Sequence, residues 1–250
     1  MRAKFDLDTQ ELKGYSTLAH GINASGKTHL AGDFLKTEQA NGIVRYINVS
    51  GEDGALTLKG MGLGGVAETV ESYKDMEDAL NEYKAANVWA IAIDSLTPLN
   101  GWVRVKTFGS DRMPNGADEW TELHRWMNNI IMLAKRSCKM LFCTCPSDRS
   151  TDQVTQKVYV TPDLPGKEAR SSAGWFDYVG YVSCEATQPG KVKRVFDMSP
   201  TPGLTVRQRL PKQILAPITL PDGPGGWAAI KAAIEEGWRI KVQPVAKGAA

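Results

Sequence analysis

The chain has 250 residues, 42% of them hydrophobic and 23% charged, and its net charge is +2. This length suffices for one well-cored α/β domain, and so small a net charge does not by itself indicate a nucleic-acid partner. The charged N-terminus lacks the apolar segment of a signal peptide, and the longest apolar run, Val88 to Ile93, is too short to span a bilayer. We therefore expect a cytoplasmic protein, in which the four cysteines lack zinc-site spacing and remain free thiols.

A phosphate-binding loop follows the first predicted strand. Residues 15–20 alternate in the manner of a strand, and Thr28 to Lys36 has a helical pattern. The stretch between them matches G-x-x-x-x-G-K-[ST] at every fixed position, and its backbone N–H groups and the helix N-terminus are suited to hold a phosphate. We expect Lys27 to reach the β- and γ-phosphates of a nucleotide and the Thr28 hydroxyl to bind Mg²⁺. The residues predicted to bind phosphate are Gly21, Ile22, Asn23, Ala24, Ser25, Gly26, Lys27 and Thr28.

Strand and helix patterns continue to residue 94. Residues 42–49 read as a strand, residues 66–71 as another, residues 73–86 have the apolar stripe of a helix, and residues 88–93 form a buried-strand run. Gly60, Gly62 and Gly65 have the spacing of a dinucleotide-binding fingerprint. No convincing strand precedes these glycines and no helix follows at once, so we interpret them as a turn.

Acidic residues at strand ends are candidates for nucleotide chemistry. Asp94 ends the buried run, where its carboxylate can bind Mg²⁺ together with Thr28. Glu52 lies just past the strand at 42–49 and is our candidate for the catalytic group that orients or deprotonates the attacking water. Asp53 is the alternative, and Glu68 is a more distant one.

Two long polar segments mark the second half of the chain. Residues 98–117 are rich in Gly and Pro and are predicted to be irregular, and residues 146–173 form the second such segment. Between them, Asp118 is expected to cap a helix that runs to about Arg136, and residues 139–145 form a buried strand.

The remaining patterns predict the fold class and domain organisation. A strand is expected at 178–185, a β-rich part at 192–220 and a closing helix at 224–237. We predict one α/β domain over residues 1–250, with a lead-in at 1–14 and a loose tail at 241–250. Its sheet is mostly parallel, with helices on both faces and antiparallel strands toward the C-terminus.

The order of these features resembles the RecA/RadA-type P-loop ATPase core. It is most similar to the compact phage-encoded RecA-like ATPases, some of which serve as single-strand-annealing recombinases. The resemblance covers about residues 14–215 and includes a candidate acid roughly two dozen residues after the loop lysine. The other stretches that carry it are VAETVES at 66–72, IDSLT at 93–97, LPGK at 164–167 and WFD at 175–177.

The resemblance implies contacts with single-stranded DNA. In RecA-like proteins two mobile segments line a central DNA path, and these correspond here to residues 100–117 and 146–172. Residues 147–172 carry four basic and four acidic side chains, so this segment is not a basic patch. The candidates for neutralising DNA phosphates are Arg104, Lys106 and Arg112 in the first segment and Arg149, Lys157, Lys167 and Arg170 in the second.

The resemblance also implies a homo-oligomer, ring or filament, with nucleotide at the subunit interfaces. Arg207 and Arg209, spaced to share one face of a strand, are candidates for reaching the γ-phosphate of a neighbouring subunit. They lie in a basic part of the chain, because residues 186–250 contain ten Lys and Arg against four Asp and Glu. One position departs from the family pattern: Pro146 and Ser147 stand where a polar γ-phosphate sensor should follow the strand, which leaves Thr144 or Ser147 for that role.

Two functions follow as hypotheses. The first is a Mg²⁺-dependent ATPase that acts on single-stranded DNA in phage recombination or strand annealing. The alternative is a nucleotide-switched assembly or loader ATPase that binds a protein partner and touches no DNA. ATP is favoured over GTP because the chain has no guanine-binding Asn/Thr-Lys-x-Asp motif.

Overall fold

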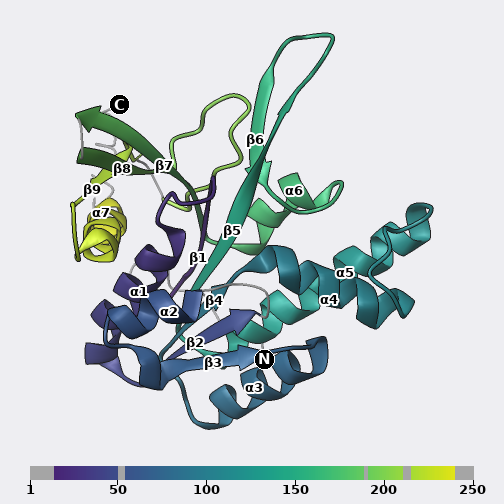
Figure 1. The fold of residues 1–250 in the computed structure, drawn as a ribbon, viewed down its shortest axis with the longest axis horizontal. Coiled ribbons are helices and arrows are strands. Elements are labelled where there is room, and N and C mark those ends of the chain that lie inside the picture. Colours follow the sequence, from purple (N-terminus) through teal and green to yellow (C-terminus); the bar gives the residue numbers. More distant parts are fainter. Residues whose placement is uncertain (1–13, 50–53, 189–190, 211–214, 240–250) are drawn as a thin grey trace, which may run out of the picture.

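A nine-stranded sheet forms the centre of the domain (Figure 1). The computed structural model describes residues 14–49, 54–188, 191–210 and 215–239. Strand order across the sheet is β3-β2-β4-β5-β1-β7-β8-β9, with β6 paired to β5. The strands are β1 (Ser16–Gly21), β2 (Val44–Val49), β3 (Ala67–Val70), β4 (Ala90–Asp94), β5 (Met140–Thr151), β6 (Val158–Pro162), β7 (Tyr178–Gln188), β8 (Lys191–Asp197) and β9 (Ile218–Leu220).

The predicted mixture of strand directions is confirmed. Neighbours from β3 to β7 pair in parallel, whereas β8, β9 and β6 are antiparallel additions. Every residue of β1 and β4 is buried, as expected for central strands covered on both faces. Because Ile93 of β4 is in register with Cys143, and His20 of β1 with Cys145, the carboxyl ends of three parallel strands meet at one edge.

Helices cover both faces of the sheet. One apolar core packs α1 (Lys27–Glu38), α2 (Gly54–Gly60) and α7 (Gly226–Arg239) on one face. A second core packs α3 (Tyr73–Ala85), α4 (Leu96–Phe108) and α5 (Ala117–Ser137) on the other. Short helical turns complete the order: α6 (Glu168–Ser171) and the 3-10 turns η1 (Gln39–Asn41), η2 (Gly64–Val66) and η3 (Ser172–Trp175). None of the helices in the described ranges is long and apolar enough to cross a membrane.

Two turn or boundary predictions have clear outcomes. Gly60 ends helix α2, Gly62 lies in the turn after it and Gly65 lies in η2, which leads into β3, so the interpretation as a turn is confirmed. Helix α5 begins at Ala117 after Gly116, and Asp118 lies in its first turn, so the prediction that Asp118 is the cap was wrong. A carboxylate in the first turn still stabilises the positive end of the helix dipole.

The segment at 98–117 is largely helical, which contradicts the predicted irregular structure. Helix α4 runs from Leu96 to Phe108 and buries Leu96, Leu99 and Val103 in the core. Pro98 lies in the first turn, where its missing N–H has no partner to lose, so the proline that suggested a loop is compatible with the helix.

The second polar segment is also more regular than predicted. Strand β5 continues past the buried part of the sheet to Thr151 and pairs with β6, from Ser147 opposite Pro162 to Thr151 opposite Val158. The resulting hairpin projects beyond the body of the domain at the top of Figure 1. Its outer residues are exposed on both faces, so they show no apolar alternation by which a strand could have been predicted.

Candidate nucleotide site

The phosphate-binding loop joins the end of β1 to the start of α1. Gly26 has a φ of 94°, a left-handed conformation that favours glycine, and immediately precedes the first residue of the helix. The Lys27 ammonium group donates hydrogen bonds to the carbonyls of Gly21 and Ile22, both at 2.9 Å. The side chain therefore curls over the loop, where a bound phosphate would meet its charge.

Asp94 stands at the end of β4, across from the loop, and accepts three hydroxyl hydrogen bonds. Thr28 Oγ1 and Tyr46 Oη each lie 2.7 Å from Asp94 Oδ2, and Thr144 Oγ1 donates to Asp94 Oδ1. Asp94 is only 3% exposed. Three donors hold this buried carboxylate in one orientation, which prepares it to bind a cation.

The side chains of Thr28 and Asp94 carry oxygen atoms, which are the ligands that Mg²⁺ prefers. Thr28 offers a hydroxyl oxygen in the first turn of α1 and Asp94 a carboxylate oxygen beside it, and within the described ranges no group of three or more His, Cys, Asp or Glu side chains could hold a metal ion. A site with one carboxylate and one hydroxyl suits Mg²⁺, because this ion usually takes its other ligands from water and substrate phosphates. Gly54 leaves room for the carboxylate, since a Cβ there would lie 2.8 Å from Asp94 Oδ2.

His20 connects the loop to two more distant segments, and the sequence alone did not single it out. Its Nε2 lies 2.7 Å from the carbonyl of Thr205 and its Nδ1 lies 2.8 Å from Ser147 Oγ. The carbonyl can only accept, so Nε2 carries the proton and Nδ1 accepts from Ser147. Burial lowers the pKa of His20 to about 4 and keeps the ring neutral. Ser147, one of the two candidate sensors, is thus tied to the residue that precedes the loop.

Arg194 on β8 is a second residue that only the tertiary structure brings to the loop. A Cβ added at Gly26 would lie 3.1 Å from Arg194 Nε. This Nε is buried and has no hydrogen-bond partner within the described part of the chain. In the sequence Arg194 is one of ten basic residues in the C-terminal part, with no spacing that relates it to the loop.

Of the three candidate catalytic acids, the structure describes only Glu68. Glu52 and its alternative Asp53 lie outside the described residues, so both remain predictions. Glu68 lies on β3 at the edge of the sheet, with β2, β4 and β5 between it and β1, and it accepts a hydrogen bond from Tyr83. This position is too far along the sheet for Glu68 to act at the loop.

The side chains of Arg207 and Arg209 are held by groups near the start of β1, away from the phosphate loop. Arg207 donates to the carbonyl of Ala173 at 3.0 Å, and Arg209 forms a 3.0 Å ion pair with Asp177, which also accepts the backbone N–H of Ser16. The predicted strand is absent at these arginines, where a single bridge joins Arg207 to Val179. They cannot serve the loop of their own chain, so the predicted role depends on a neighbouring subunit.

The basic residues of the first segment are held by their own surroundings. Arg104 pairs with Asp111, and Arg112 contacts both carboxylate oxygens of Glu119, at 2.7 and 2.6 Å. Lys106 is exposed, with its ammonium 5.6 Å from the centre of the Trp126 ring. The two arginines are therefore neutralised locally, which weakens the prediction that this segment holds DNA phosphates.

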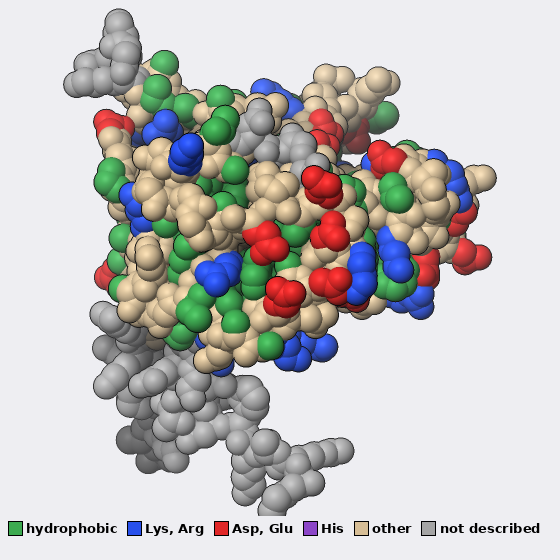
Figure 2. Space-filling model, turned by 60° about the horizontal axis from the view of Figure 1, so that its bottom comes forward, with side chains coloured by type: hydrophobic (Ala, Val, Ile, Leu, Met, Phe, Trp, Pro, Cys, Tyr) green, Lys and Arg blue, Asp and Glu red, His purple; other side chains and the backbone are tan. Residues whose placement is uncertain are grey.

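The basic residues of the second segment are exposed on the hairpin and at its base. Within the described ranges, no ion pair is formed by Arg149, Lys157, Lys167 or Arg170. The Arg170 guanidinium lies over the Tyr159 ring, 4.8 Å from its centre. By contrast, acidic side chains gather on the face turned forward in Figure 2, over α3, which carries Asp75, Glu77, Asp78 and Glu82.

Comparisons with known proteins agree with this geometry. A family model described as an AAA domain, AAA_24, matches residues 13–210. No curated protein matches the chain. A KaiC-like protein of the archaeon Pyrococcus horikoshii has a similar fold, with a TM-score of 0.50 and 15% identity over 86% of this chain and 88% of that chain. The flagellar accessory protein FlaH of Methanocaldococcus jannaschii gives a TM-score of 0.47 and 14% identity over 85% of this chain and 87% of that chain. The family model and the fold shared with the KaiC-like protein confirm the RecA-like P-loop fold.

Proposed function

The chain belongs to the AAA_24 family of AAA domains and is an ATPase, and from this premise we propose that it hydrolyses ATP with Mg²⁺ while acting on single-stranded DNA. We further propose a role in recombination or strand annealing in the cytoplasm, as in the phage-encoded RecA-like proteins that its sequence resembles. The 2.7 Å contact between Thr28 and Asp94 supports the nucleotide half of this proposal. The cations on and beside the β5–β6 hairpin, which form no ion pair with any residue that the structure describes, support the proposed action on DNA.

In the proposed reaction, the loop N–H groups and Lys27 hold the β- and γ-phosphates of ATP. Thr28 and Asp94 would hold Mg²⁺, which would offset charge on the phosphates. Arg194 adds a cation beside Gly26 from the same chain, 3.1 Å from the Cβ position of that glycine. Glu52 orients the attacking water, and Arg207 and Arg209 act on the γ-phosphate of a neighbouring subunit in a homo-oligomer.

The DNA half rests on the hairpin cations rather than on the first segment. Arg149 and Lys157 are exposed on the projecting hairpin, while Lys167 and Arg170 lie at its base. An exposed cation without a carboxylate partner is available to neutralise a phosphate, whereas one already paired must first give up its partner.

Rates of ATP hydrolysis with and without single-stranded DNA test this proposal. We expect DNA to stimulate the wild type and Lys27→Ala to abolish turnover. Replacing Arg149 and Lys157 together by Ala should lower the salt dependence of DNA binding by ~0.7 in slope for each phosphate that is no longer neutralised. Arg112→Ala is the matched control, because this arginine is already paired to Glu119. A wild type that binds no DNA at low salt would refute the DNA half.

A second function, a nucleotide-switched assembly or loader ATPase, is favoured by one observation. Arg104 and Arg112, two of the three basic candidates in the first segment, pair with carboxylates of their own chain. This function predicts slow hydrolysis that DNA does not change. The same rate measurement therefore separates the two functions.

A further inference from the structure

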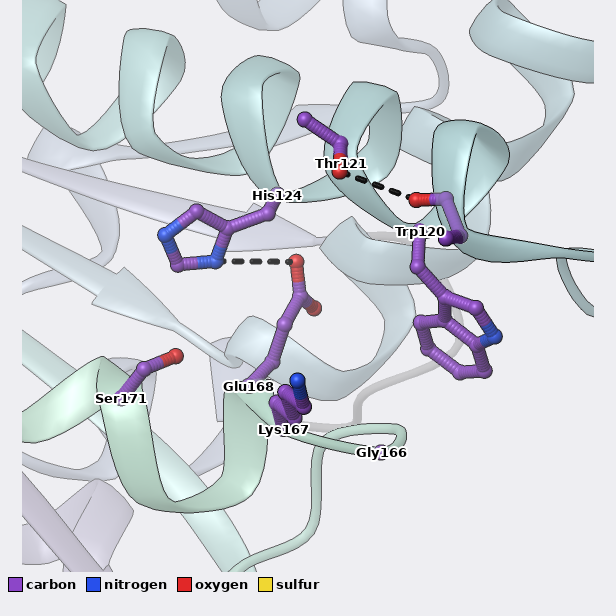
Figure 3. A pocket seen from close by; sticks show the side chains of 8 residues that line it. Trp120, Thr121, His124, Gly166, Lys167, Glu168 and Ser171 are labelled. Carbon is purple, nitrogen blue, oxygen red and sulfur yellow. Dashed lines mark hydrogen bonds and ion pairs between the residues drawn. The ribbon is translucent and has the colours of Figure 1, made fainter.

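A cavity of about 700 Å³ lies between the first half of α5 and the turn that leads into α6 (Figure 3). This volume falls in the ~300–1,000 Å³ range of small-molecule sites. The cavity separates the two segments for which DNA contacts are predicted, and it is distinct from the nucleotide site at the carboxyl end of β1. Its lining residues are Ala117, Trp120, Thr121, His124, Gly166, Lys167, Glu168 and Ser171.

A buried carboxyl group with one unpartnered oxygen stands in the wall of this cavity. Glu168 is 2% exposed, and its Oε2 accepts a 2.6 Å hydrogen bond from Asn100 Nδ2. Its Oε1 has no hydrogen-bond partner within the described residues, since His124 Nδ1 is 3.9 Å away. The hydroxyl of Ser171 is also buried without a partner there. Buried polar atoms are nearly always paired, so an oxygen of this kind points to a donor supplied by a ligand.

The other walls suit a flat ligand with a nearby negative charge. Trp120 presents its indole beside Glu168, and the Gly166 backbone packs so closely on this ring that a Cβ would lie 2.9 Å from it. Lys167 is exposed at the rim, and no ion pair holds it within the described ranges. The aromatic wall suits the ring of a base, the buried acceptor suits an N–H group on the edge of that base, and the lysine at the entrance suits the phosphate of the same nucleotide.

We propose that this cavity holds one unstacked base of the single-stranded DNA, whose amino group donates to Glu168 Oε1 while its ring packs against Trp120. This inference rests on the proposed action on single-stranded DNA and adds to it a site that reads the base. Lys167 and the neighbouring Arg170 neutralise the phosphates on either side of that nucleotide.

The proposed contact predicts which bases fit. Adenine, cytosine and guanine carry an exocyclic amino group, whereas thymine presents carbonyls on both sides of its single N–H. At pH 8, above the pKa of about 7 to which burial raises Glu168, the carboxylate only accepts. The two carbonyls beside the thymine N–H are repelled by this carboxylate, so cytosine is preferred over thymine. Because both bases are pyrimidines of similar size, this preference reports the hydrogen bond rather than the fit.

Affinities of equal-length oligo-dC and oligo-dT, measured by fluorescence anisotropy at pH 8, test the proposal. One hydrogen bond of this kind gives the wild type a preference for oligo-dC of about five- to tenfold. In Glu168→Gln, the amide oxygen keeps the bond from Asn100 and the NH₂ group takes the place of Oε1, so the variant has no acceptor for the cytosine amino group and the preference is lost. Trp120→Phe weakens binding of both oligonucleotides by about threefold to tenfold without changing the preference.

The possible results distinguish the base site from the proposed action on single-stranded DNA. A preference for oligo-dC that Glu168→Gln removes supports the base site, because a merely structural role for Glu168 would change the affinities for both oligonucleotides alike. Equal binding of both oligonucleotides by the wild type and Glu168→Gln overturns the base site and leaves the proposed action on DNA intact. Salt-insensitive or absent binding of both refutes the proposed function and the base site together.

Discussion

Two buried carboxyl groups, equally hidden from solvent, differ in how they are satisfied. Asp94 and Glu168 are 3% and 2% exposed. Asp94 accepts hydrogen bonds from Thr28, Tyr46 and Thr144, whereas Glu168 accepts one from Asn100 and leaves Oε1 without a hydrogen-bond partner in the described chain. Burial raises the pKa of Glu168 to about 7. The carboxylate at the nucleotide site is therefore held by its own neighbours, whereas Glu168 keeps one oxygen for the base that we propose binds in the cavity between α5 and α6.

The largest expected effect is at Asp94. Asp94→Asn removes the charge that we propose binds Mg²⁺ and turns one acceptor into a donor that faces a hydroxyl donor. We expect ATP turnover to fall by at least ~10²-fold and the free energy of unfolding to fall by about 2–4 kcal/mol. Steady-state hydrolysis and chemical denaturation measure the two effects. Asp78→Asn makes the same chemical change in an exposed ion pair and should cost less than ~0.5 kcal/mol.

The second expected effect is an increase in the free energy of unfolding when Glu168 is replaced by Gln. Because its pKa is raised to about 7 by burial, the folded state holds this proton more tightly than the unfolded state, and the free energy of unfolding falls as pH rises from about 4.5 to about 7. Arg104 is a cation that acts on this carboxyl group, and the imidazole of His124 lies 3.9 Å from Oε1. Glu168→Gln cannot ionise and should be more stable than the wild type by about 2–3 kcal/mol at pH 8.

Denaturation of both proteins at pH 4.5 and pH 8 measures this difference. The wild type and Glu168→Gln should converge at pH 4.5, where both carry a neutral side chain. A constant difference between them across this range would contradict the inference that Glu168 is buried without a compensating charge.

His20 is a third buried ionisable group, and both of its ring nitrogens have hydrogen-bond partners. Its pKa is lowered to about 4 by burial, so the unfolded state binds the proton first and the free energy of unfolding falls as pH drops from about 6.5 to about 4. The expected loss is about 2 kcal/mol, which His20→Gln should not show. Glu168 changes stability in the reverse direction over part of this range, so the measurement is best made in the Glu168→Gln background.

The smallest expected effect is the removal of one of the three donors to Asp94. Tyr46→Phe keeps the packing of the buried ring and deletes one hydroxyl, while Thr28 and Thr144 still hold the carboxylate. We expect a loss of about 1 kcal/mol in stability and less than tenfold in turnover. A loss as large as that of Asp94→Asn would show that the three donors act as one unit rather than as partly independent contacts.

Local patterns were enough for the nucleotide loop and for most of the parallel sheet. The spacing of Gly21, Gly26, Lys27 and Thr28 predicts a phosphate loop because backbone conformation and helix start are set within eight residues. Asp94 could be predicted because it ends a run of apolar residues long enough for a buried strand. Helix α4 could not be predicted, because Pro98 interrupts its helical pattern. The β5–β6 hairpin could not be predicted either, because its outer residues are exposed on both faces and show no apolar alternation.

The sequence by itself determined the class of fold, the position of the phosphate loop and the carboxylate opposite it, because these depend on residues close together in the chain. Only the tertiary structure decided that His20, Ser147 and Thr205 form one hydrogen-bonded link, that Arg194 lies against Gly26, and that Glu168 faces Trp120 across a cavity. These contacts join residues 48 to 185 positions apart, and their energy comes from burial and pairing that exist only after the sheet has formed. The separation in sequence is the physical reason that no local pattern could predict them.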